Sequence, residues 1–115
     1  MTTFEEREKG FEAKYRHDQE KRFKIIARRN KLLGLWAAER MGLKEGAAEA
    51  YAREVVQADF AKPGDSDVVE KVLGDLGGKG IEMTEPKLRR EMDRLLAVAE
   101  EQINRAAPRD TPETI

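Results

Sequence analysis

The segment from Phe23 to Met41, FKIIARRNKLLGLWAAERM, most constrains how this chain can fold, because its apolar residues recur at helical spacing. Residues three or four positions apart lie on the same side of a helix. Two adjacent rows at this spacing form one wide apolar face: Phe23, Ile26, Asn30, Leu33 and Ala37, and beside them Ile25, Arg29, Leu32 and Trp36. The segment therefore predicts a helix over about 23–41 that packs against other helices.

Three later segments have helical patterns that could cover this face. The second predicted helix, about 47–60, follows Gly42, which suits the left-handed turn after a helix. Its many alanines would let it approach a neighbour closely. Its predicted inward residues are Ala48, Tyr51, Ala52, Val55, Val56 and Phe60.

The third and fourth predicted helices cover about 66–77 and 85–106. Asp65, Ser66 and Asp67 are candidate caps for the third, with Asp67 and Glu70 placed as a reciprocal capping pair. Thr84 is a suitable cap for the fourth helix. The apolar face of the third helix consists of Val68, Val69, Val72, Leu73 and Leu76, and that of the fourth of Leu88, Met92, Leu95, Leu96, Ala99 and Ile103.

No segment alternates polar and apolar residues as a half-buried strand would. The length of 115 residues fits one domain with one modest core. The sequence therefore predicts an all-α protein, a small four-helix bundle over 23–107 with the first and last helices as its spine. Residues 1–22 are expected to form a mobile, partly helical N-terminal extension, and residues 108–115 a loose C-terminal tail.

The N-terminal segment has only a thin apolar pattern. Phe4, Phe11 and Tyr15 would fall on one narrow stripe of a helix. Gly10 disfavours the helix by about 1 kcal/mol relative to alanine, so the helix is marginal when alone in water. The pattern is typical of a helix that forms in a partner's groove; the alternative is a solvated extension without a partner.

Charge and composition exclude several classes of function. Lys and Arg number 22 and Asp and Glu 23, a balance that gives no overall attraction to nucleic acid or anionic lipid. Cysteine is absent, which is compatible with a reducing compartment. There is no secretory signal pattern and no apolar stretch near 20 residues. We therefore expect a cytoplasmic protein that neither inserts into a membrane nor binds nucleic acid.

Residues that could carry chemistry are few. His17 is the only histidine and cannot form a histidine-rich metal site. We expect it to have a structural or neutral role; the alternative is a pH-sensitive group beside Asp18. The glycines at 74–80 follow a helix rather than a strand, unlike a phosphate-binding loop. Asn30 lies on an apolar row and would need a partner if buried. No nucleophile, base and oxyanion site is assembled, so we expect neither an enzyme nor a metal protein.

Three sequence motifs resemble one known family over essentially the whole chain. They are F-x-x-R-E-K-x-F-E at Phe4–Glu12, A-R-R-N-K-L-L-G-L-W-A-A-E at Ala27–Glu39 and A-D-F-x-x-P-G-D at Ala58–Asp65. With LRREMDRLLAVAEEQI near the end, the chain resembles the ζ subunit of alphaproteobacterial F1-ATPase, long catalogued as a domain of unknown function. The family has a four-helix fold with a mobile N-terminal segment.

The resemblance implies an inhibitor of ATP hydrolysis whose partners are the F1 α, β and γ subunits, at the inner face of the plasma membrane. Its N-terminal segment would enter a catalytic α/β interface, become helical and block rotation of γ. The free chain is expected to be a monomer without a cofactor. The residues expected to bind F1 are Phe4, Glu5, Arg7, Glu8, Lys9, Phe11, Glu12, Lys14 and Tyr15.

An alternative interpretation is a helical regulatory module that binds ATP or ADP weakly and does not inhibit. The cluster ARRNK, residues 27–31, supplies cations that could contact phosphate groups, although on a helix they spread around the surface. The candidate nucleotide-binding residues are Arg28, Arg29, Lys31 and Trp36.

Overall fold

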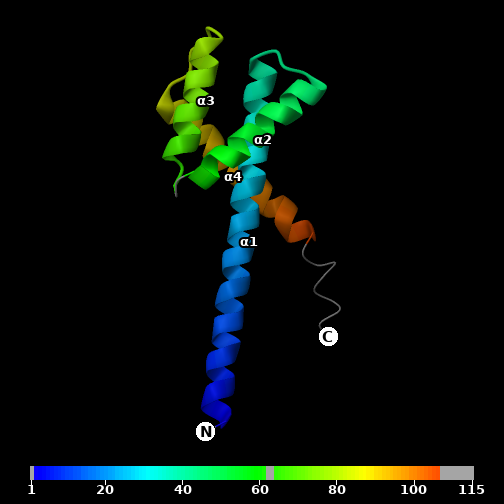
Figure 1. Cartoon of the computed structure of the whole chain (residues 1–115), viewed down its shortest axis with the longest axis vertical. Coiled ribbons are helices and arrows are strands. Elements are labelled where there is room, and N and C mark those ends of the chain that lie inside the picture. The colour runs from blue at the N-terminus through cyan, green and yellow to red at the C-terminus, as the bar shows by residue number, and fades with distance from the viewer. Residues whose placement is uncertain (1, 62–63, 107–115) are drawn as a thin grey trace.

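The structure is a computed structural model that describes residues 2–61 and 64–106, with the backbone alone at positions 2–17 and 61. It consists of four helices, and the described residues contain no strand: α1 (Thr2–Arg40), α2 (Glu45–Ala61), α3 (Ser66–Gly78) and α4 (Glu85–Ala106). Figure 1 shows α2, α3 and α4 gathered around the C-terminal half of α1. The predicted all-α, four-helix fold is confirmed.

α1 is a single helix of 39 residues, whereas the sequence predicts an N-terminal segment followed by a helix from about Phe23. At 1.5 Å per residue such a helix is about 58 Å long. Its N-terminal half extends beyond the other three helices (Figure 1). Glu, Lys and Arg, all good helix formers, link the two predicted pieces without a proline, which explains why the helix is continuous.

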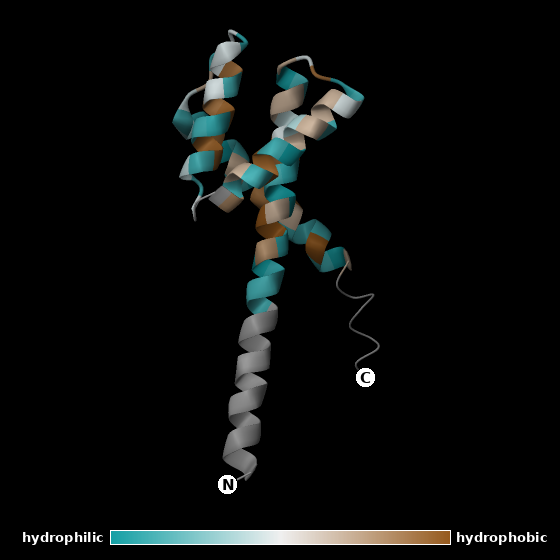
Figure 2. Cartoon of the chain, in the orientation of Figure 1, coloured by the Kyte–Doolittle hydropathy of each residue, from teal (hydrophilic) through white to brown (hydrophobic). Residues whose placement is uncertain are grey.

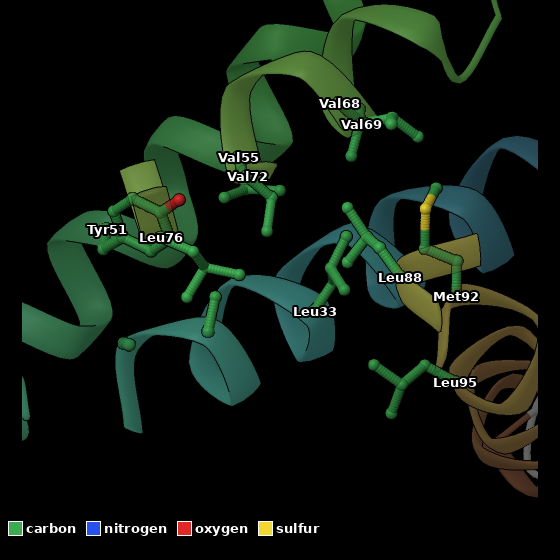
Figure 3. Close-up of a cluster of buried hydrophobic side chains, with 12 residues drawn as sticks. Leu33, Tyr51, Val55, Val68, Val69, Val72, Leu76, Leu88, Met92 and Leu95 are labelled. Carbon is green, nitrogen blue, oxygen red and sulfur yellow. The ribbon is translucent and has the colours of Figure 1, made fainter. Parts of the chain in front are cut away.

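The core lies where the other helices meet the C-terminal half of α1. Figure 2 shows the apolar residues concentrated there, and Figure 3 shows side chains from all four helices meeting. α1 contacts the other three helices, α2 more extensively than α4, so α2 shares the spine predicted for α1 and α4. The largest fully buried apolar side chains are Leu33, Val55, Val68, Val72, Leu76 and Leu88.

α1 and α2 approach each other closely at Gly34. A Cβ added to Gly34 would lie 2.6 Å from Ala52 Cα and 3.1 Å from Ala52 Cβ, closer than atoms normally pack. The crossing therefore depends on glycine in one helix and alanine in the other. The prediction that the alanines of the second helix permit a close approach is confirmed at Ala52.

Two aromatic residues predicted to face inward are exposed instead. Phe23 is 55% and Phe60 61% exposed, and their ring centroids lie 5.6 Å apart. Phe23 precedes Arg29, the first buried residue among the described side chains of α1, and Phe60 lies in the last turn of α2. The helical pattern continues through both residues, but the core ends before it reaches them.

The helix ends follow the sequence at two positions and depart from it at a third. Gly42 has φ +78° after α1, and the Lys87 N–H donates to Thr84 Oγ1 at 3.4 Å at the start of α4, both as predicted. Asp65 occupies the N-cap position of α3, but its side chain makes no capping hydrogen bond. Its carboxylate is used elsewhere.

Candidate functional site

A buried polar cluster ties α1 to the residue that begins α3. Arg29, 4% exposed, donates from Nη2 to Asp65 Oδ1 at 2.7 Å and from Nη1 to Asp65 Oδ2 at 3.2 Å. Arg29 Nε and Nη2 also donate to Asn30 Oδ1, at 3.0 and 2.9 Å. The forked guanidinium thus binds one carboxylate with two donors while contacting the neighbouring amide. This cluster explains why an amide, Asn30, and a cation, Arg29, lie on the otherwise apolar face of α1.

The charges around Arg29 set the ionisation of two aspartates. The hydrogen bonds from Arg29 hold the pKa of Asp65 below its usual value. Burial raises the pKa of nearby Asp59, and the charge of Arg29 acts against that rise. Asn30 Nδ2 is buried, and no described residue accepts a hydrogen bond of good geometry from it. A weaker interaction of Asn30 with Asp59 also acts to lower the pKa of Asp59. The buried cation Arg29 therefore acts to lower the pKa of both carboxyl groups.

A second polar cluster joins α2 to α3. Tyr51 Oη donates to Asp75 Oδ2 at 2.8 Å, and Lys71 Nζ bridges Asp75 Oδ2 and Glu54 Oε1, each at 3.1 Å. Lys71 also lies over the Tyr51 ring, 5.3 Å from its centroid. Burial, with Asp75 adding to it, raises the pKa of Tyr51, so the phenol keeps its proton. The cluster fixes the two helices relative to each other.

The residues predicted to bind nucleotide have different environments. The Arg29 guanidinium is engaged by Asp65 and Asn30, whereas Arg28 and Lys31 are exposed. Trp36 packs against the core, with Arg40 over its ring at 4.4 Å. No contact of the described residues brings these four side chains together. Nucleotide binding stays a prediction.

The residues predicted to bind F1, from Phe4 to Tyr15, lie outside the residues whose side chains the structure describes, as does His17. Their backbone forms part of α1. The assignment of binding roles to these side chains therefore stays a prediction.

Two hollows flank α1 where it leaves the bundle. One, of about 470 Å³, lies between α1 and α4 and contains Arg29 and Asp65 in its wall. The other, of about 630 Å³, is lined by Gln19, Glu20, Arg22, Phe23, Lys24 and Ile26. Arg22 and Ile26 line both hollows, so residues 18–26 form the exposed base of the projecting half of α1.

Within the described residues, none of the helices is long and apolar enough to cross a membrane. No group of three or more His, Asp or Glu side chains is placed to hold a metal ion in the same part of the chain.

The sequence pointed to the polar cluster only indirectly. Asn30 on an apolar row indicated a buried polar contact, but its neighbour Arg29 supplies it. Asp65 was predicted to cap a helix because it directly precedes one. Its position in the sequence gave no indication that it pairs with Arg29, 36 positions earlier. The exposed pair of Phe23 and Phe60 was missed because apolar periodicity does not indicate where a core ends.

These features define a small all-α protein in which one helix of a four-helix bundle extends beyond the other three. The chain belongs to the family of ATPase inhibitor subunit zeta, which it matches over residues 1–102. It is also similar to a protein whose structure was solved by NMR in solution, at 50% sequence identity and a TM-score of 0.65. That similarity covers 73% of this chain and 95% of the other. No curated protein matches the chain.

Membership in this family gives the chain a general role as an ATPase inhibitor, that is, a regulatory subunit of an F-type ATPase.

Proposed function

We propose that this chain inhibits ATP hydrolysis by F1-ATPase by inserting the N-terminal part of α1 into a catalytic α/β interface, where it blocks rotation of the γ subunit. The observation that carries the proposal is the continuous helix α1, whose N-terminal half extends beyond the bundle in a chain of an ATPase-inhibitor family (Figure 1). Bound in this way, the chain would be peripheral to the inner face of the plasma membrane.

The physical basis is the fit of one amphipathic helix to a groove. A helix with its side chains is about 10–12 Å wide. The sequence offers Phe4, Phe11 and Tyr15 for apolar burial and charges of both signs beside them. Apolar burial and charge pairing in the groove offset the cost of ordering such a segment.

The bundle acts as a stop in this mechanism. Four packed helices are at least about twice as wide as one helix, so the bundle stays outside a groove that admits α1 alone. The Gly34–Ala52 contact and the Arg29–Asp65 ion pair hold α1 firmly in the bundle. A force on the inserted part is therefore transmitted to the whole molecule.

The test is a titration of F1, depleted of its own inhibitory subunit, with the full chain and with a chain lacking Met1–Tyr15. The full chain is expected to inhibit ATP hydrolysis to saturation, and the shortened chain to have no effect. The core residues of α1 begin at Arg29, so the shortened chain keeps the core contacts of the bundle, which circular dichroism and thermal unfolding would verify. Equal inhibition by a folded, shortened chain would refute the mechanism.

A further inference from the structure

The exposed aromatic pair beside the base of the projecting helix has no role in the mechanism described above. Phe23 on α1 and Phe60 on α2 are the large hydrophobic residues exposed among those the structure describes, at 55% and 61%. Their rings contact each other at 5.6 Å, and Phe23 lines the hollow of about 630 Å³ together with Ile26. We call Phe23, Ile26 and Phe60 the shoulder.

We propose that the shoulder is a second contact with the ATPase, docking on an apolar patch of the outer surface beside the groove that α1 enters. This inference rests on the proposed function and adds a binding surface to it. Exposed aromatic pairs suit this role, because aromatic anchors bury a large area with little loss of side-chain freedom and commonly dominate interface energies.

Continuity along α1 identifies the ATPase as the occupant. Tyr15 and Phe23 are eight residues apart on one helix, about 12 Å along its axis. A body that encloses the helix as far as Tyr15 therefore comes close to the shoulder, and the C-terminal end of α4 also extends toward this part of α1 (Figure 1). Helical register points the same way: Arg22 and Ile26 follow Phe11 and Tyr15 by eleven residues each, slightly more than three full turns.

The charges around the shoulder favour a protein surface over a nucleic acid or an anionic membrane. Glu20, Arg22 and Lys24 line the same hollow as Phe23, and they carry both signs. An apolar centre with a polar, mixed-charge rim is the usual composition of a protein–protein contact. The described residues that line this hollow do not form the basic surface that nucleic acid or anionic lipid would require.

Substitution of Phe60 tests the shoulder without altering the inserted segment. Phe60→Ser is expected to raise the concentration for half-maximal inhibition of F1 about tenfold, and Phe60→Leu, which keeps most of the apolar area, less than about threefold. Glu49→Ser is the matched control, because position 49 is exposed, precedes Phe60 by eleven residues and lies on the same face of α2, about 16 Å away. Circular dichroism and thermal unfolding would verify that all three variants are folded.

An environment-sensitive fluorophore provides a second readout. The chain has no cysteine, so Lys24→Cys and Glu49→Cys each give one labelling site. Addition of F1 is expected to shift the emission of the probe at position 24 to the blue and to leave the probe at position 49 unchanged.

The outcomes separate this inference from the proposed function. If the unaltered chain inhibits F1 and Phe60→Ser inhibits equally well, the shoulder is not a docking surface, although the insertion mechanism stands. If the unaltered chain does not inhibit, the proposed function itself fails. If the probe at position 24 shifts with protein concentration in the absence of F1, a second copy covers the shoulder and the proposal is overturned.

Discussion

At the scale of single residues, one ion pair explains why two polar side chains are buried in α1. Arg29 is 4% exposed and Asn30 fully buried, yet both lie on the apolar face of α1. The carboxylate of Asp65 gives the guanidinium its charge partner, and Asn30 Oδ1 accepts the remaining inward donors. A buried cation is tolerated only when it is paired and hydrogen-bonded. Asp65, at the N-cap position of α3, thus holds α1 in place through Arg29.

Removal of that carboxylate should destabilise the bundle. Asp65→Asn leaves Arg29 buried without a full counter-charge, which costs several kcal/mol at fully buried sites. Because the Asp65 side chain is 42% exposed, we expect a smaller loss, about 1–3 kcal/mol in the free energy of unfolding. Denaturant titration would measure it. Asp67→Asn, which removes the same charge two residues later, should cost less than about 1 kcal/mol; equal losses would contradict this account.

The ion pair also predicts a pH dependence. The pKa of Asp65 is lower in the folded protein than in the unfolded chain, where it is near 3.9. The folded state therefore binds fewer protons, so the stabilisation is complete above about pH 4 and is lost as the pH falls through the folded pKa. The difference in Tm between the unaltered protein and Asp65→Asn should narrow from pH 7 to pH 3. A difference that stays constant over this range would argue against the ion pair.

At the scale of the helices, apolar spacing predicted where α2, α3 and α4 lie and most of the residues that they bury. Val68, Val72 and Leu76 of α3 and Leu88, Met92 and Leu95 of α4 are buried as predicted. The spacing could not predict that α1 is continuous, because the apolar pattern of residues 1–22 is thin and suggests a segment separate from the helix that begins near Phe23. Nor could it predict the exposure of Phe23 and Phe60, because periodicity gives the side of a helix and not the end of the core.

The crossing of α1 and α2 depends on Gly34, although alanine has the higher helical propensity at such a position. Alanine favours a helix over glycine by about 1 kcal/mol, yet Gly34→Ala would place Cβ 2.6 Å from a backbone atom of α2. The helices must separate, so we expect a net loss of about 1–3 kcal/mol in the free energy of unfolding. Gly74→Ala within α3 has nothing within 4 Å of its new Cβ and should stabilise by about 0.5–1 kcal/mol. Thermal and denaturant unfolding would measure both changes, and the same sign for both would refute the close-packing argument.

At the scale of the whole molecule, the four helices form one bundle from which the N-terminal half of α1 projects (Figure 1). The bundle encloses a core that all four helices share, and α1 extends beyond it (Figures 1 and 3). Sequence spacing was sufficient for the number and type of the helices, because each buried face repeats at helical spacing. The surface that meets a partner could not be predicted in the same way, since its apolar residues are few and their burial occurs only in the complex.

The most direct measurement of the central claim is photo-crosslinking from the projecting half of α1. Gly10→Cys places a single cysteine there, at a position within the segment that is not itself among the residues expected to contact F1. Glu49→Cys places one on the bundle. Each variant would carry a photoreactive benzophenone and be irradiated while it inhibits F1. The account predicts products with the α and β subunits from position 10, mapped by mass spectrometry to residues inside a catalytic interface, and none there from position 49. Inhibition without products inside that interface from position 10 would contradict insertion of α1.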